Sequence, residues 1–211
     1  MIRVLLADDH GLVREGLRGI LAKGSDIEVA AKAANGDEVL ALVKARDFDL
    51  ALLDLSMPGL SGLALIKRLK VERPKLRILV LSMHGESQYA ARALKAGASG
   101  YLTKDSAAAQ LLGAIRKIAA GGVQISEAAA AQLIGARGAA DTPHAALSDR
   151  EYEVLRQIVA GRSVTEIAEA LHLSVKTVST HKARILEKLD LAGTADLVRY
   201  AIEHGLTDQR G

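Results

Sequence analysis

The stretch "LALLDLSMPGLSG" (Leu50–Gly62) opens with a continuous apolar run and closes in a loop that contains Pro and Gly. An unbroken apolar run is typical of a central parallel strand that is covered on both faces, since a strand with one wet face alternates. Asp54 stands where this strand should end. The stretch therefore predicts a buried parallel strand with a carboxylate at its carboxyl end.

Working outward, the first 120 residues repeat the order strand then helix five times. That order predicts a doubly wound, flavodoxin-like α/β domain, in which a five-stranded parallel sheet carries helices on both faces. We expect strands at residues 2–7, 28–33, 50–55, 77–83 and 100–103, and helices at 11–23, 36–46, 62–72, 87–97 and 106–120.

Composition narrows the class of protein. The 211 residues suffice for two modest domains, and the absence of Cys excludes disulfide scaffolds and Cys-based zinc sites. One Phe and four Tyr offer few platforms for stacking single-stranded nucleic acid. No signal-peptide pattern and no apolar run of about 18 residues is present, so we expect a cytoplasmic protein that does not associate with membranes.

The pattern changes after the fifth helix. Residues 126–136 have the composition of a helix, whereas residues 137–146 show no period and indicate a linker. Four helices follow, and the first two begin with the capping-box spacing of Ser and Glu. We predict an α/β domain at 1–121, a linker at 122–146 with room for one helix, and an all-α helix-turn-helix domain at 147–208.

Charged and polar side chains stand at the ends of the predicted strands. Asp8 and Asp9 follow the first strand, and Asp54 ends the third. Carboxyl ends of neighbouring parallel strands converge, so the three carboxylates should share a pocket that needs a hard cation, Mg²⁺ or Mn²⁺. Ser82, Tyr101 and Lys104 reach the same rim, where a hydroxyl and an ammonium suit a phosphoryl group. Each signal alone has a plainer interpretation, because adjacent Asp residues often form only a solvated turn. His10 is interpreted as a loop residue and not as a metal ligand.

The stretch "SVTEIAEALHLSVKTVSTHKARILEKL" (Ser163–Leu189) has the layout of a helix-turn-helix. On a helical wheel the second helix places Val175, Val178, Ile185, Leu186 and Leu189 on one face and Lys, Thr and Arg on the other. A basic and hydroxyl-bearing face suits the major groove of DNA. A helical protein-interaction domain is the alternative, since exposed Lys and Arg are common on helices.

The first 121 residues resemble the receiver domain of bacterial two-component response regulators. "ADDH", "LLDLSMPGLSG", "LVLSMH" and "GASGYLTKD" carry the resemblance. It implies that Asp54 accepts a phosphoryl group from a cognate sensor histidine kinase. Asp9, Asp54 and the backbone carbonyl of Ser56 would hold the metal, with Asp8 acting mainly through water. Lys104 would contact the phosphoryl oxygens, and Ser82 and Tyr101 would form the switch pair.

The second half resembles the LuxR-type DNA-binding domain of the NarL/FixJ subfamily, through "LSDREYEVLRQIVAG", "EIAEALHLSVKTVSTHKARILEKL" and "ADLVRYAIEHGL". The resemblance implies binding to double-stranded promoter DNA by a homodimer that forms on phosphorylation, and it leaves RNA polymerase open as a third partner. It places Ser179, Thr180 and Ala183 at base edges. The phosphate contacts would come from Lys176, Thr177, Lys182, Arg184 and Lys188.

Two other functions deserve comparison with a phosphorylation-controlled transcription factor. An effector enzyme is disfavoured because the second half has no nucleophile motif and no metal-ligand pair. A receiver that never becomes phosphorylated is disfavoured by the complete set of Asp8, Asp9, Asp54 and Lys104. We therefore expect no enzymatic activity beyond the receiver's own phosphoryl transfer and dephosphorylation.

Overall fold

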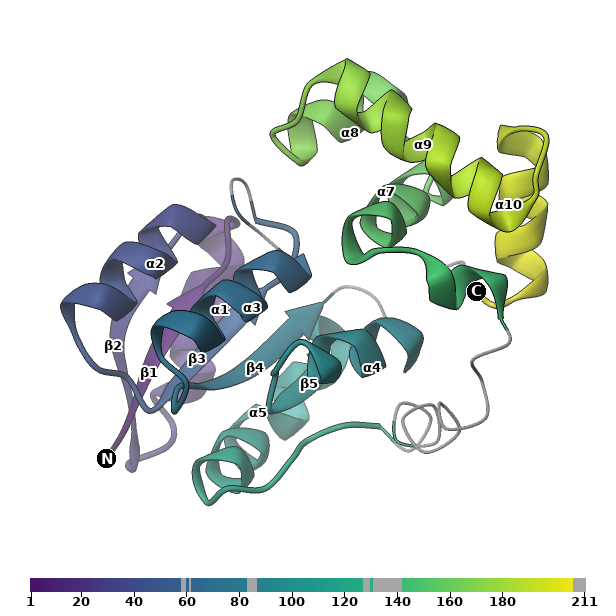
Figure 1. The fold of residues 1–211 in the computed structure, drawn as a ribbon. Helices are drawn as coiled ribbons and strands as arrows, with labels where there is room; N and C mark the ends of the chain where they lie inside the picture. Colours follow the sequence, from purple (N-terminus) through teal and green to yellow (C-terminus); the bar gives the residue numbers. More distant parts are fainter. Residues whose placement is uncertain (58–59, 61, 83–86, 127–129, 131–141, 207–211) are drawn as a thin grey trace. The chain divides into compact units, whose positions relative to one another are not determined.

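The computed structural model describes residues 1–57, 60, 62–82, 87–126, 130 and 142–206 (Figure 1). The chain divides into two compact units, Met1–Gln132 and Leu133–Gly211. Each unit is described by itself.

The first unit contains the predicted five-stranded parallel sheet, with strand order β2-β1-β3-β4-β5. The strands are β1 (Ile2–Ala7), β2 (Ile27–Ala33), β3 (Leu50–Asp54), β4 (Arg77–Ser82) and β5 (Gly100–Thr103). All five residues of β3 are buried, and β3 pairs with β1 on one side and β4 on the other. The prediction of a central strand from its apolar run is confirmed.

Helices cover both faces of this sheet (Figure 1). They are α1 (Gly11–Leu21), α2 (Gly36–Ala45), α3 (Gly62–Glu72), α4 (Ser87–Lys95) and α5 (Lys104–Ala119). α1 packs beside α5 over one aliphatic core, while α3 packs against α2 and α4. α5 begins two residues before the predicted Ser106, because the Thr103 side chain accepts a hydrogen bond from the Ser106 N–H and caps the helix.

The second unit is helical. Its described elements are η1 (Pro143–Ala146, a 3₁₀ helix), α7 (Asp149–Val159), α8 (Val164–Ala170), α9 (Val175–Leu189) and α10 (Thr194–Glu203). Ser148 and Ser163 form the two predicted capping boxes at the starts of α7 and α8. The helix expected over 126–136 lies largely outside the described residues. α7 and α8 both pack against α9, and Val178, Ile185 and Leu189 of α9 are buried.

Two side chains of this unit differ from what a helical wheel predicts. Val175 was expected in the core, but it is 48% exposed. It is the first residue of α9, and helical side chains lean toward the N-terminus, so no preceding turn of α9 lies beneath it. Leu186, expected on the same face, is only partly buried.

A buried aromatic group joins the first and last described elements of the second unit. His144 of η1 is 3% exposed, and its Nδ1 lies 2.8 Å from the Tyr200 hydroxyl of α10 in a hydrogen bond. The Tyr200 ring stacks on His204 with ring centres 4.0 Å apart. The contact satisfies a polar ring atom that burial has removed from water.

Candidate functional site

The sheet topology brings three carboxylates to one edge. Asp8 and Asp9 follow β1, and Asp54 is the last residue of β3, the strand next to β1. Ala7 pairs with Leu53, so the two strands end at the same level. Asp8 is 1% exposed and Asp54 is 2% exposed. Burying two carboxylates is costly unless a cation neutralises them.

Lys104 supplies one such cation. Its ammonium nitrogen lies 2.7 Å from Asp8 Oδ2 and 3.0 Å from Asp54 Oδ2. Burial acts to lower the pKa of Lys104, but its hydrogen bonds to both carboxylates raise that pKa above its usual value. Burial raises the pKa of Asp54, aided by the charge of Asp8 and opposed by Lys104. Lys104 is therefore held as an ammonium between two acidic groups.

Asp9 gives the pocket a third carboxylate. Its Oδ1 atom is buried and accepts no hydrogen bond, although it lies 2.7 Å from His10 Nδ1. Asp8, Asp9, His10 and Asp54 each offer one ligand atom, and these four atoms all lie within 4.8 Å of one another. Three carboxylates and one ammonium leave a net negative charge in the pocket, and carboxylate oxygens are the ligands that Mg²⁺ prefers. The donor set fits a divalent cation of that kind.

The remaining predicted residues lie on the neighbouring strand ends. Ser82 ends β4, is 2% exposed and pairs in register with Thr103. Tyr101 lies on β5 and is 6% exposed. Ser56 follows β3, and its backbone N–H donates to Asp54 Oδ1 at 3.3 Å.

Two residues near this pocket were missed from the sequence. His10 lies in the loop before α1, as predicted; its backbone N–H donates to Asp8 Oδ1 and its ring approaches Asp9. Arg14 of α1 donates a hydrogen bond from its guanidinium to the backbone carbonyl of Asp8. His10 directly follows the "DD" pair, and Arg14 lies one helical turn after His10. This closeness in sequence to Asp8 and Asp9 is the only signal by which the two residues could have been predicted.

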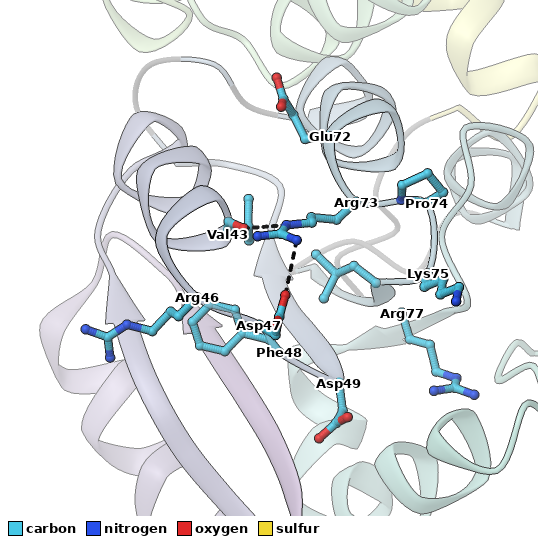
Figure 2. Close-up of a pocket in the computed structure, with 11 residues that line it drawn as sticks. Val43, Arg46, Asp47, Phe48, Asp49, Glu72, Arg73, Pro74, Lys75 and Arg77 are labelled. Atoms are coloured by element: carbon cyan, nitrogen blue, oxygen red, sulfur yellow. Dashed lines mark hydrogen bonds and ion pairs between the residues drawn. The ribbon is translucent and has the colours of Figure 1, made fainter.

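A separate pocket of about 460 Å³ lies at the opposite ends of β3 and β4 (Figure 2). Arg73 spans it, donating from Nε to the Val43 carbonyl and pairing with Asp47 at 3.1 Å. Its lining residues include Asp49, directly before β3, and Arg77, the first residue of β4, so the pocket lies at the amino ends of these strands. Ligands of open parallel sheets bind at the carboxyl ends. The pocket is therefore distinct from the carboxylate cluster.

The second unit contains the predicted helix-turn-helix, formed by α8 and α9. The turn between them passes through His172, which has a left-handed backbone (φ 50°). The Leu173 N–H donates to the Ala168 carbonyl at 2.8 Å, which closes the end of α8. The Ser174 side chain accepts from the Thr177 N–H and starts α9.

One side of α9 is open to solvent. Ser179 and Thr180 are exposed, and each hydroxyl donates at 2.9 Å to the carbonyl four residues earlier. Those bonds leave the hydroxyl oxygens free to accept. Burial lowers the pKa of His181, which disfavours a positive charge on this ring. The other exposed residues of α9 beyond its first residue are Lys176, Ala183, Arg184, Glu187 and Lys188, with Thr177 and Lys182 partly buried.

Lys188 has a partner within its own unit. Its ammonium lies 2.7 Å from Glu151 Oε2 and donates to the Ala146 carbonyl at 3.3 Å. Burial alone would raise the pKa of Glu151, but hydrogen bonds from Lys188 and Ser148 lower it to about 2. Lys188 thus links α9 to α7, and these contacts do not support its predicted role as a phosphate contact.

Among the residues that the structure describes, no helix combines the length and apolarity needed to cross a membrane.

Family models match both units. The response regulator receiver domain matches residues 4–116, and the LuxR family of bacterial regulatory proteins matches residues 145–201. Response regulator UvrY of Escherichia coli (strain K12) is 36% identical over 209 residues, covering 98% of this chain and 96% of UvrY.

Solved structures of the response regulator RcsB are also similar. RcsB from Salmonella enterica serovar Typhimurium, bound to promoter rprA in the presence of phosphomimetic BeF₃⁻, gives a TM-score of 0.69 at 30% identity and covers 94% of this chain and 97% of that chain. A structure of two RcsB dimers bound to two parallel DNAs gives a TM-score of 0.60 at 29% identity and covers 95% of this chain and 98% of that chain. The chain belongs to the NarL/FixJ family of two-component response regulators, with a receiver domain and a LuxR-type helix-turn-helix domain that make it a DNA-binding regulator of transcription.

Proposed function

We propose that Asp54 is the acceptor of a phosphoryl group from a sensor histidine kinase, and that its phosphorylation controls dimerisation and DNA binding. The observation that carries this proposal is the buried Asp8–Lys104–Asp54 cluster at the carboxyl ends of β1 and β3. A carboxylate there is positioned to attack phosphorus, breaking the P–N bond to the kinase histidine and forming an acyl phosphate.

The metal site would be made by Asp8, Asp9, Asp54 and the backbone carbonyl of Ser56. A bound Mg²⁺ or Mn²⁺ would neutralise charge on the incoming phosphoryl oxygens. Asp9 supports this assignment because one of its carboxylate oxygens lies within 4.8 Å of ligand atoms of Asp8 and Asp54. The same residues would hold water for the return hydrolysis of the acyl phosphate.

Lys104, Ser82 and Tyr101 would respond to the new charge. The Lys104 ammonium, now between two carboxylates, would turn to the phosphoryl oxygens. The Ser82 hydroxyl ends the strand next to β3 and would donate to the same group. Tyr101 on β5 would rearrange with them and carry the change to the surface.

The exposed side of α9 would enter the major groove of promoter DNA. Ser179, Thr180 and Ala183 would face base edges, where a hydroxyl accepts or donates and the Ala methyl contacts thymine. The phosphate contacts would be Lys176, Thr177, Lys182 and Arg184. Lys188 is left out because Glu151 already holds its ammonium.

A dimer would supply the needed specificity. One helix-turn-helix reads only a few base pairs, so two copies on paired half-sites are expected. RcsB dimers on DNA support this proposal. We place the protein in the cytoplasm, where kinase and promoter are both accessible.

The test uses the full-length protein with acetyl phosphate and Mg²⁺. We expect mass spectrometry to locate one acyl phosphate on Asp54 and light scattering to show a dimer. Affinity should rise for DNA with two half-sites more than for DNA with one. Labelling of Asp54→Asn at the wild-type level, or labelling that persists in chelator, would refute the acceptor site. Labelling on Asp54 without a change in mass or affinity would refute the control of DNA binding.

A further inference from the structure

The segment that follows α5 lies along the outer edge of β5. β5 is the last strand of the sheet, and no other strand among the described residues pairs with its outer edge. Residues 122–126, here called the edge segment, fill part of that place. The Tyr101 N–H donates to the Gln124 carbonyl at 2.8 Å, and the Gln124 N–H donates to the Ser99 carbonyl at 3.2 Å. Gln124 is thereby paired with Gly100 as in a parallel ladder.

The fit at this pairing is close. A Cβ atom on Gly100 would lie 2.9 Å from the Gln124 carbonyl oxygen and 2.7 Å from Ile118 Cδ1, both below normal contact. The edge segment is also fixed to the end of α5, where the Gly122 N–H donates to the Lys117 carbonyl at 2.9 Å. The backbone at Gln124 is therefore held from two directions, and β5 at Gly100 cannot move outward without displacing it.

The pairing involves the backbone of the switch residue itself. β5 has four residues, with Tyr101 second, and Lys104 follows directly as the first residue of α5. A rearrangement that moves Lys104 toward a phosphoryl group and reorients Tyr101 acts on this short strand from both positions. The hydrogen bond from the Tyr101 N–H to Gln124 lies in its path.

We infer that Gln124 is a positioning residue for Tyr101: the edge segment holds β5 in its unphosphorylated position, and phosphorylation of Asp54 releases the segment. This inference rests on the proposed function of Asp54 and adds a coupling that the proposal does not contain. Release would loosen the chain directly after the receiver, at the point where the connection to the second unit begins. The receiver's structural influence would then extend past the end of α5.

Thermodynamic linkage makes the coupling measurable from both sides. If phosphorylation weakens the Gln124 pairing by some factor, then loss of the pairing strengthens binding of a phosphoryl mimic by the same factor. We expect about fivefold or more, the lower end of typical coupling between two sites.

The first measurement is amide hydrogen exchange by NMR on the full-length protein with Mg²⁺, with and without beryllofluoride. Exchange at the Tyr101 and Gln124 amides should become about fivefold faster or more when beryllofluoride is bound. The Leu52 amide in the buried strand β3 serves as the reference and should keep its rate, which separates release of the segment from global unfolding. Unchanged or slower exchange at Gln124 would overturn the inference.

The second measurement is beryllofluoride affinity in variants. Gly100→Ala places a methyl group against Gln124, and Gln124→Pro removes the N–H that donates to the Ser99 carbonyl. If one of these variants fails to fold, the other provides the measurement. Val123→Ala is the matched control, because the Val123 side chain is 50% exposed and its neighbours' backbone bonds stay intact. The first two variants should bind beryllofluoride more tightly by the factor seen in exchange, and the control should bind as wild type.

The outcomes separate the two proposals. Wild-type affinity in a folded Gly100→Ala or Gln124→Pro variant would overturn the positioning role of Gln124 while leaving Asp54 as the acceptor. If the wild-type protein bound no beryllofluoride and took up no phosphoryl group at Asp54, the proposed function would fail, and this inference with it.

Discussion

The Lys104 ammonium lies 3.0 Å from the Asp54 carboxylate and serves as the resident counter-charge of the candidate acceptor. It also lies 2.7 Å from Asp8, so its removal would leave two buried carboxylates without a cation. We expect Lys104→Met to lower the free energy of unfolding by about 3–5 kcal/mol without metal, the usual cost of an uncompensated buried charge. Urea unfolding followed by circular dichroism in the presence of a chelator measures this loss.

Added Mg²⁺ should restore much of the stability of Lys104→Met, because a ligand that binds only the folded state stabilises it. The gain should be larger in the variant than in the wild type, where Lys104 competes for the same carboxylates. An equal gain in both proteins would contradict the shared pocket.

Asp9→Asn should weaken Mg²⁺ binding by at least about tenfold, since even residues that only support a ligand typically account for 10- to 100-fold. The change removes the negative charge of Asp9, whose Oδ1 lies 2.7 Å from His10 Nδ1, and keeps the size of the side chain. Titration calorimetry of the full-length protein gives the affinity. Asp37→Asn on α2 is the control, as Asp37 is an exposed carboxylate outside the cluster. Equal affinities for all three proteins would rule out Asp9 as a ligand.

Neutralising Lys176 and Arg184 together should reduce the slope of log affinity for DNA against log salt by about two, close to one per lost phosphate contact. Lys188→Gln should leave the slope unchanged, because Glu151 holds the Lys188 ammonium. Fluorescence anisotropy at several salt concentrations measures both slopes. A full unit of slope lost on Lys188→Gln would reassign that residue to the interface.

The Glu151–Lys188 pair should make stability depend on pH. The folded-state pKa of Glu151 is lowered from 4.5 to about 2, so its contribution is fully present above pH 4.5 and is lost as pH falls toward 2. Glu151→Gln should cost about 1–3 kcal/mol near neutral pH, a typical loss for a charged hydrogen bond. The difference from wild type, measured by hydrogen exchange of α7 amides, should shrink across that window. A constant difference would show that the pair does not titrate as expected.

Tyr200→Phe should destabilise the second unit by about 1–3 kcal/mol, the cost of leaving a buried polar atom without its bond. The change removes only the hydroxyl that lies 2.8 Å from His144 Nδ1 and keeps the ring that stacks on His204. Thermal unfolding followed by circular dichroism tests this. Tyr152→Phe in α7, which removes the hydroxyl of another buried tyrosine, serves as the comparison. An unchanged transition in Tyr200→Phe would show that the bond to His144 adds nothing.

The features of the fold that follow a periodic or local sequence pattern could be predicted from the sequence. The apolar run before Asp54 predicted a strand buried on both faces, and parallel pairing then placed Asp8 and Asp54 at one edge without any measured distance. The Ser–Glu spacings predicted two capping boxes, because that motif is local and needs no tertiary contact.

Other features depended on contacts that no local pattern encodes. A helical wheel places Lys188 on a flank of α9, but the packing of α7 decides that its ammonium contacts Glu151. Val175 fitted the apolar face by period, yet it lies at the end of a helix, where its side chain stays about half exposed. The pairing of Gln124 with Gly100 is an isolated bridge of one residue pair, so no periodic sequence pattern predicts it.

Asp8 and Lys104 are in contact although they are 96 positions apart in the chain. Forming such a contact closes a long loop, which costs conformational entropy. On the ribosome, a nascent receiver cannot complete this pocket until the start of α5 has left the exit tunnel. The proposed acceptor pocket is therefore complete only in chains that have been synthesised past Lys104.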